Sequence, residues 1–169
     1  YCLLTKSDGS DEIIELFEIL SNRVIVSSHV EKEKWLLSTT PFSSNSRYVV
    51  IGIIKNWIRG LANIGAVKIL DASTGGVKDF EVELSEIWAS DGRVNIVLSP
   101  NGKHLLCDAS DTLKLLDLES GGSKIRNLGQ HVSLDVMTFS PDSQFMAASF
   151  GSEGKVIKIW DTSTWKSVE

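Results

Sequence analysis

The sequence has few cysteines and prolines and no long apolar run. Its 169 residues include two cysteines, Cys2 and Cys107, and three prolines. Small secreted domains that depend on disulfides usually carry more cysteines, so the composition favours a reducing compartment, and we expect the protein in the cytoplasm or nucleus. No stretch of about 18 apolar residues is present, so we expect no membrane insertion. No basic segment followed by an apolar one is present near Tyr1, so no signal peptide is visible in this sequence, which we expect to start inside a longer product.

The sequence also has fewer basic than acidic residues. Lys and Arg total 17 against 22 Asp and Glu, which gives a formal net charge of −5. Binding to a phosphate backbone needs a basic face, so this balance argues against a nucleic-acid partner. With 42% hydrophobic and 23% charged residues, the chain has the composition of a globular protein with a core.

Residues that carry chemistry are sparse and scattered. The three histidines, His29, His104 and His131, are not spaced with another His, Cys or Asp in the way metal ligands are. Neither cysteine lies in a CxxC or other nucleophile context, and the Gly-x-Ser-x-Gly elbow of hydrolases is missing. The segment 151–155 lacks the spacing and the Lys-Ser/Thr ending of a phosphate-binding loop. We therefore expect a protein that is not an enzyme and has no metal and no cofactor.

The sequence does contain an internal repeat. A segment of the pattern apolar-Lys-apolar-apolar-Asp occurs three times and ends at Asp71, Asp117 and Asp161. These aspartates lie 46 and 44 residues apart, and each is followed by a short turn-like segment. A weaker copy, Ile14–Glu18, lies upstream. A period of this length indicates units of structure that pack against their own copies.

A turn sequence recurs in step with this pattern. The segments 99–102 and 140–143 both begin with Ser-Pro and lie 41 residues apart. Proline presets φ at the first corner of such a turn, and Asn, Asp or Gly tolerate the second. We interpret Thr40 and Pro41 as an earlier, altered copy, which gives that unit about 18 residues more than the next.

Short apolar or alternating runs between these markers predict four strands in each unit. In the last unit they begin at Val136, Phe145, Val156 and Trp165. Four antiparallel strands repeated every 41 to 46 residues predict an all-β protein made of β-propeller blades. The segment Asp11–Leu20 also has apolar residues at helical spacing, but the match of its centre to the later strands favours a strand.

The last unit resembles a WD40 repeat. Its segment Phe139-Ser140-Pro141-Asp142 resembles the family's Phe-Ser-Pro-Asp-Gly turn, and Trp160-Asp161 resembles its Trp-Asp ending. The third unit is similar, with Leu116 in place of the tryptophan, and the likeness weakens toward the N-terminus. The resemblance implies WD40-like β-propeller blades of four antiparallel strands in an incomplete ring that holds about half of the blades.

The repeat and the resemblance together divide the chain into four parts. Residues 1–30 are expected to end one blade, 31–84 to form a second blade with a loop insertion near 54–65, 85–128 a third blade and 129–169 a fourth.

The resemblance also implies a structural role for several residues of the last unit. A typical WD40 repeat has a hydrogen-bonded set of side chains, which here would be His131, Ser149, Glu153 and Trp160, with Asp161 closing the strand. Glu153 stands where the family has Asp, and Gln130 separates Gly129 from His131.

Two unusual connections are the candidates for partner binding. The insertion carries Trp57, Ile58 and Arg59, and the connection before the third unit carries Trp88 and Arg93. Large aromatic side chains and arginine in surface loops are typical of binding hot spots. The alternative is that the tryptophans pack back onto their blade. Strand-like alternation before Trp88 favours packing there, and for Trp57 the two interpretations carry equal weight.

The resemblance implies a WD40-repeat scaffold that mediates protein–protein interactions in a multi-subunit assembly, with other proteins as partners. The alternative is a ligand-sensing propeller attached to a nucleotide-binding ATPase or to an enzyme domain outside this chain. A fold alone does not decide between these functions.

Overall fold

The computed structural model describes residues 1–9, 11–31, 35–58, 61–90, 93–109, 112–120, 124–130, 134–150 and 156–168. Every regular element in these ranges is a β-strand, which confirms the all-β prediction. Within the same ranges, no helix has the length and apolar character needed to cross a membrane.

The first sheet contains three antiparallel strands in the order β1-β2-β3. They are β1 (Cys2–Asp8), β2 (Asp11–Glu18) and β3 (Arg23–Glu31). The preference for a strand at the start of the chain is therefore confirmed, because β2 pairs with a neighbour on each side. Ile14 and Leu16 alternate with partly exposed residues along β2 and are fully buried, as expected for a strand with one face on a core.

The second sheet is built from β4 (Trp35–Phe42), β5 (Tyr48–Ile58), β6 (Leu61–Asp71) and β7 (Gly76–Ser90). The third sheet is built from β9 (Ile96–Leu98), β10 (His104–Ala109), β11 (Thr112–Asp117) and β12 (Lys124–Gln130). The two sheets join into one nine-stranded system, because Ile87 of β7 pairs with Ala109 of β10. The short β8 (Arg93–Val94) lies between β4 and β7 in this system.

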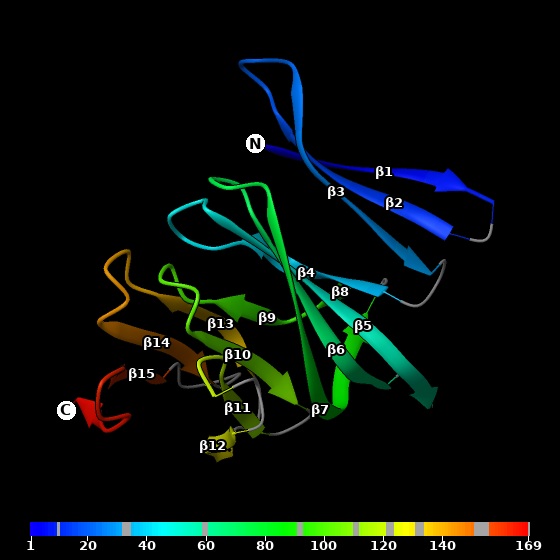
Figure 1. Cartoon of the computed structure of the whole chain (residues 1–169). Helices are drawn as coiled ribbons and strands as arrows, with labels where there is room; N and C mark the ends of the chain where they lie inside the picture. The colour runs from blue at the N-terminus through cyan, green and yellow to red at the C-terminus, as the bar shows by residue number, and fades with distance from the viewer. Residues whose placement is uncertain are drawn as a thin grey trace.

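The fourth sheet has the order β13-β14-β15-β16 and is antiparallel throughout. Its strands are β13 (Leu134–Phe139), β14 (Phe145–Phe150), β15 (Val156–Asp161) and β16 (Ser167–Val168). The three apolar-Lys-apolar-apolar-Asp segments all lie at the ends of third strands, in β6, β11 and β15. The repeat in the sequence is therefore a repeat of sheets, which Figure 1 shows following one another from β1–β3 to β13–β15.

The expected loop insertion near residues 54–65 is wrong. Strands β5 and β6 continue through this region and pair as far as Ile58 and Leu61. Each of the two strands has 11 residues, whereas β10 and β11 have six. The additional residues include Ile54, Trp57, Ile58 and Ile64, which favour strands, and a ladder satisfies the backbone groups of the segment better than an open loop would. The extra length is therefore a hairpin extension of the second sheet.

Three apolar cores hold the four sheets together. One contains Ile14 and Leu16 of the first sheet with Val49, Ile51 and Leu70 of the second. The next joins the second and third sheets, and the last joins the third and fourth. The second and third sheets are thus buried on both faces, which explains the nearly continuous apolar runs of β5 and β10.

Candidate interaction surface

The turns between the first two strands of the second, third and fourth sheets share one hydrogen-bond pattern. In the third sheet, His104 N–H donates to Ser99 Oγ at 2.9 Å, and this hydroxyl donates to Asn101 Oδ1 at 2.7 Å. Lys103 N–H donates to the same amide oxygen at 3.0 Å. The same arrangement is built on Ser43 with Asn45 and on Ser140 with Asp142. A short polar side chain that accepts from its own turn favours this backbone over helix or strand.

The earliest copy of this turn is at residues 43–48, and the interpretation of Thr40 and Pro41 as that copy is wrong. Both of these residues lie within β4. The true copy has no proline, so the Ser-Pro pattern does not find it. It shares with the later copies a serine followed two residues later by Asn or Asp. The side-chain oxygens of these two residues hold the turn. A search for Ser-x-Asn/Asp would have located Ser43.

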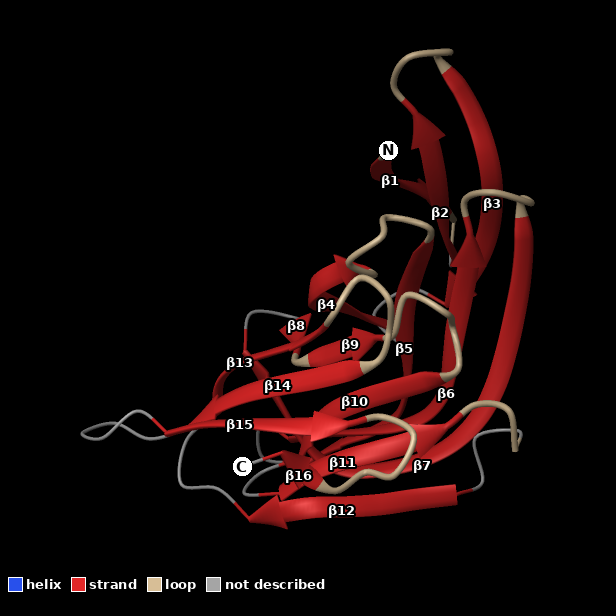
Figure 2. Ribbon diagram, turned by 90° about the vertical axis from the view of Figure 1, so that its left-hand side faces the viewer, coloured by secondary structure: helices blue, strands red, loops and turns tan. Residues whose placement is uncertain are grey.

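The three turns are also hydrogen-bonded to one another, and together they form what we call the turn rim. Asn45 Nδ2 donates to Pro100 O at 2.9 Å, and Asn101 N–H donates to Ser143 Oγ at 3.0 Å. Gly102 has a φ of +73°, and a Cβ at this position would lie 3.1 Å from the Tyr48 ring. The rim therefore continues across sheet boundaries, and Figure 2 shows the turns after β4 and β9 side by side.

Aspartates at the ends of the third strands organise a second set of turns. Asp161 Oδ1 accepts from Ser163 N–H at 2.9 Å and from Thr164 N–H at 3.0 Å. Asp71 accepts from Ser73 N–H at 2.8 Å and also receives two hydrogen bonds from the Arg47 guanidinium, at 2.9 and 3.2 Å. Burial alone would raise the pKa of Asp71, but the hydrogen bonds from Arg47 and Ser73 outweigh it and hold that pKa well below its usual range.

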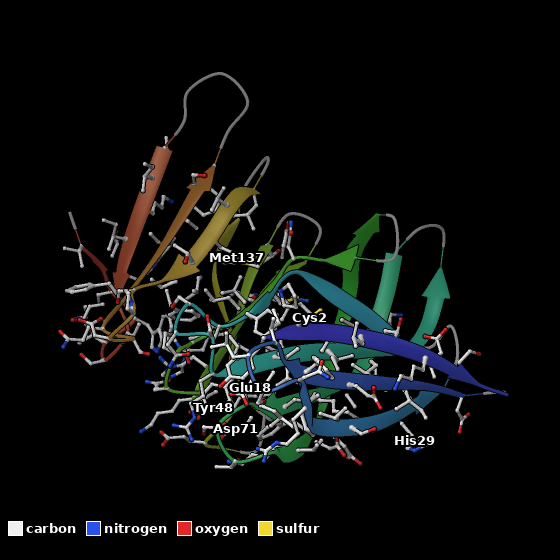
Figure 3. All side chains as sticks on the ribbon, turned by 90° about the horizontal axis from the view of Figure 1, so that it is seen from above. Cys2, Glu18, His29, Tyr48, Asp71 and Met137 are labelled. Atoms are coloured by element: carbon white, nitrogen blue, oxygen red, sulfur yellow. The ribbon has the colours of Figure 1, made fainter. Side chains whose placement is uncertain are left out.

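These turns place charged and polar groups at one end of the sheets. Figure 3 shows Glu18, Tyr48 and Asp71 near each other there, with His29 at the far end of the first sheet. A pocket of about 270 Å³ opens between the first and second sheets at this end, lined by Tyr1, Glu18, Arg23, Ile25 and the turn 72–75. The Lys103–Glu119 ion pair, 2.8 Å long, lies on the same side of the third sheet.

Two members of the hydrogen-bonded set implied for the last unit, Ser149 and Trp160, lie apart in the structure. Trp160 pairs with Met146, whereas Ser149 pairs with Ile157 three residues along β15. Because side chains alternate along a strand, Ser149 and Trp160 lie on opposite faces of the fourth sheet and cannot belong to one set. Trp160 is instead 5% exposed in the core between the third and fourth sheets, with its ring edge-to-face on Phe150 at 6.3 Å.

The other members of that set, His131 and Glu153, lie outside the described residues.

The predicted binding residues belong to strands and not to loops. Trp57 and Ile58 lie in β5, Trp88 lies in β7 and Arg93 lies in β8. Trp57 pairs with Ala62 and Trp88 pairs with Leu61, so the two tryptophans flank the start of β6 in adjacent rows of the sheet. Arg59 lies outside the described residues, as do the side chains of the other four. Binding by these residues stays a prediction.

Groups that could carry chemistry are dispersed in the part of the chain that the structure describes. Its His, Cys, Asp and Glu side chains do not gather in threes as a metal site requires. Burial raises the pKa of the Cys107 thiol, which keeps it protonated. His104 packs edge-to-face on Trp165 with ring centroids 5.0 Å apart, and its burial lowers its pKa. His29 is exposed on β3.

Known proteins that are similar to the chain include β-propellers. The family model described as "WD domain, G-beta repeat" matches residues 122–161. No curated protein sequence matches the chain. TolB from Acinetobacter baumannii is 17% identical, with a TM-score of 0.51 over 98% of this chain and 39% of that one. The β-propeller domain of the Trilobed protease from Pyrococcus furiosus is 13% identical, with a TM-score of 0.54 over 81% of this chain and 42% of that one.

The chain thus spans about two fifths of the length of these two structures. Likenesses at such low identity establish the fold, and the matched repeat adds the family of the last unit. The sheet order, the repeated turns and the three cores between sheets are those expected of consecutive propeller blades. The chain therefore has the fold of part of a β-propeller, and its residues 122–161 match the WD40 repeat.

Proposed function

We propose that the chain is a scaffold that binds other proteins within a multi-subunit assembly. One observation carries this proposal: the residues that recur with the repeat are committed to turns and cores. Ser99 and Asn101 hold one turn, Asp161 holds another, and Leu116 and Trp160 fill cores. WD40 repeats in propellers generally serve as protein-interaction scaffolds. A rigid frame of this kind supports binding through the parts that differ between units.

The part that differs most is the extension of the second sheet. Its strands β5, β6 and β7 have 11, 11 and 15 residues, against six, six and seven for β10, β11 and β12. The extension holds Trp57, Ile58 and Trp88, and Arg93 follows it in the chain. Tryptophan and arginine are enriched among residues whose truncation weakens protein–protein binding most. We therefore place the partner contact on this extension.

A capture experiment tests this assignment. The protein and a Trp57→Ala/Trp88→Ala variant are used as baits in cell extract, and captured proteins are identified by mass spectrometry. We expect the variant to keep its circular dichroism spectrum and to lose a defined set of partners. A Leu20→Ala variant is the matched control, because Leu20 is fully exposed on the turn between β2 and β3 and lies outside the extension. Capture of the same proteins by all three baits would contradict the assignment.

A second candidate function is a ligand-sensing propeller attached to an enzyme or ATPase domain outside this chain. The likeness to the propeller domain of the Trilobed protease favours it, since that propeller belongs to a protease. The two candidates differ in what the rest of the polypeptide contains. A hydrolase or nucleotide-binding domain in the coding sequence next to this segment would support the second, and further WD40 repeats alone would support the scaffold.

A further inference from the structure

One tryptophan has a backbone conformation that large side chains avoid. In the first, second and fourth sheets, the turn after the third strand has one residue with a positive φ, when β2 is counted as the third strand of its unit. That residue is Asn22 at 52°, Gly75 at 71° and Trp165 at 56°. Glycine and asparagine tolerate the left-handed region, whereas a bulky side chain there is strained. The contacts of the Trp165 side chain must therefore compensate for the strain of its backbone.

The Trp165 ring makes these contacts on the sheet before its own. It lies edge-to-face against the ring of His104 in β10, with the two centroids 5.0 Å apart, and it borders the core that joins the third and fourth sheets. The equivalent Gly75 comes close to the preceding sheet through its backbone, since a Cβ there would lie 3.0 Å from Ile25 O of β3. The fourth sheet thus makes through one aromatic side chain, packed on a histidine, a contact that the second sheet makes through its backbone.

The surroundings of His104 favour its neutral ring. Nδ1 is buried and has no hydrogen-bond partner among the described residues. Both ring nitrogens carry a proton in the imidazolium, so an N–H at Nδ1 would have no acceptor. The side chain is half-buried, and this burial lowers the pKa of His104.

The charged groups that act on the ring are of both signs. In the third sheet, Asp117 and Glu119 favour the imidazolium, whereas Lys103 and Arg126 oppose it. Lys103 and Glu119 also pair with each other at 2.8 Å. The turn of the fourth sheet that packs on the ring carries one charge of each sign, Asp161 and Lys166. The effect of burial is therefore not outweighed by a surplus of negative charge.

We propose that His104 and Trp165 form a proton-dependent latch between the third and fourth sheets. While the imidazole is neutral, the two rings stay in contact and keep Trp165 in the left-handed region. The imidazolium needs water or an acceptor, so protonation separates the rings and lets the Trp165 backbone relax. The latch is closed at neutral pH and opens as the pH falls below about 6.5.

Opening is local, because the turn has hydrogen bonds that do not involve the ring. Asp161 Oδ1 accepts from the N–H groups of Ser163 at 2.9 Å and Thr164 at 3.0 Å. Hydrogen bonds from Ser163 and Thr164 hold the pKa of Asp161 below its usual range, so this carboxylate stays ionised where histidine titrates. Opening therefore exposes the indole of Trp165 at the polar end of the fourth sheet and leaves the turn in place.

Fluorine NMR of the full chain, labelled with 5-fluorotryptophan, tests the latch. The chain has five tryptophans, and the signal that disappears in Trp165→Phe belongs to Trp165. Between about pH 8 and about pH 5, we expect this signal to shift with a midpoint below about 6.5. Its solvent isotope shift between H2O and D2O should grow, because the ring becomes exposed. The signal of Trp160, in the core between the same two sheets, and the circular dichroism spectrum should not change.

Two histidine variants show which group controls the shift. His104→Phe should abolish the titration of the Trp165 signal. His29→Gln is the matched control, because His29 is exposed on β3, and it should leave the titration unchanged.

Trp165→Gly tests the energetic link by urea unfolding, since it removes the ring and the backbone strain together. The stability advantage of the unchanged chain over this variant should shrink from about pH 8 to about pH 5, because the ring is released at the lower pH. The greater freedom of glycine in the unfolded chain is the same at both pH values and cancels. In the His104→Phe background, the difference should not depend on pH.

Three results would overturn the latch. A midpoint above about 6.5 would mean that the indole stabilises the imidazolium as an aromatic ring stabilises a cation. A Trp165 signal that does not titrate would mean that the contact ignores the charge of His104. A shift of the Trp165 and Trp160 signals together, with loss of the circular dichroism spectrum, would mean that acid unfolds the sheets and opens no local contact.

Discussion

At the scale of single residues, the turn rim depends on backbone conformations that few side chains tolerate. Gly102 has a positive φ and lies against the Tyr48 ring of the preceding sheet, so two separate constraints act on it. Gly9 also has a positive φ, of 63°, but a Cβ there would meet nothing within 4 Å. A comparison of Gly102 with Gly9 therefore separates the energetic cost of the left-handed backbone from the cost of crowding against Tyr48.

We predict that Gly102→Ala lowers the free energy of unfolding more than Gly9→Ala does. An alanine in the left-handed region costs about 1–2 kcal/mol, and this loss should be common to both variants. At residue 102 the Tyr48 ring must also move, because the new Cβ would lie 3.1 Å from it. Urea unfolding followed by circular dichroism measures the free energy of unfolding of both variants. Equal losses of this free energy would show that the Tyr48 ring moves aside without cost.

The charge state of His104 affects the contact between the third and fourth sheets, because its ring packs on Trp165. Burial lowers its pKa, and its Nδ1 is buried without a hydrogen-bond partner among the described residues. The charged groups around it are Asp117, Glu119, Lys103 and Arg126, all from its own sheet. The folded chain therefore favours the neutral imidazole, packed on Trp165.

Stability should consequently fall as the solution is acidified. The unfolded chain has the ordinary histidine pKa of about 6.5 and takes up the proton first, so the stabilisation is complete above that pH and is lost as pH falls toward the lower folded pKa. His104→Phe should remove this dependence, since Phe145 and Tyr48 occupy the equivalent positions. Thermal unfolding at about pH 8 and about pH 5 measures it. His29→Gln, at an exposed histidine, is the control and should retain the full pH dependence.

At the scale of strands and sheets, sequence patterns predicted what repeats and missed what varies. The apolar-Lys-apolar-apolar-Asp pattern located β6, β11 and β15, because a core position recurs there in every unit. The sequence predicts a loop where the β5–β6 extension lies, since an insertion in one unit has no copy with which to compare it. Thr40 and Pro41 were mistaken for a turn because proline is the most visible turn residue, although Ser43 and Asn45 carry the hydrogen bonds.

The candidate site was predicted less well for a physical reason. Resemblance placed Ser149 and Trp160 in one hydrogen-bonded set, but one residue of register decides which face of a sheet a side chain occupies. That register depends on pairing with β14, which no spacing within β15 reveals.

We predict that Ser149 and Trp160 are energetically independent. Trp160→Ala should cost about 3–5 kcal/mol, as truncation of a large core aromatic does. Trp160→Leu should cost much less, because Leu70 and Leu116 fill the same position in other sheets. In a double-mutant cycle with Ser149→Ala, measured by urea unfolding, the coupling should stay below about 0.5 kcal/mol. A coupling well above that value would restore the hydrogen-bonded set.

At the scale of the whole molecule, apolar burial is greater in the central sheets than in the two end sheets. The second and third sheets bury both faces within one chain, while the first and fourth bury one. The extreme strands β1 and β16 each pair with a single neighbour among the described residues. Stacked repeats of this kind gain stability from each contact between neighbours.

We predict that amide hydrogen exchange is slowest in the central strands of the second and third sheets, β5, β6, β10 and β11, and fastest in β1 and β16. Opening of an end sheet breaks one core, whereas opening of the second or the third sheet breaks two. Exchange followed by mass spectrometry of peptic fragments measures this order. Uniform protection across the four sheets would mean that the stack opens only as a whole.

The turn rim also gives the stack a direction. Asn45 donates a hydrogen bond to the turn of the following sheet, and Asn101 donates one to the turn after that. Each turn thus donates to the turn of the next sheet and accepts from the turn of the preceding one. Each repeat therefore has a hydrogen-bond donor on the side of the next repeat and an acceptor on the side of the preceding one. A repeat could be duplicated or removed only if its donor and its acceptor both survive, and the order of the chain around the rim cannot be reversed. Growth and loss of repeats in such a protein would therefore proceed by whole units, cut at the same point of each turn.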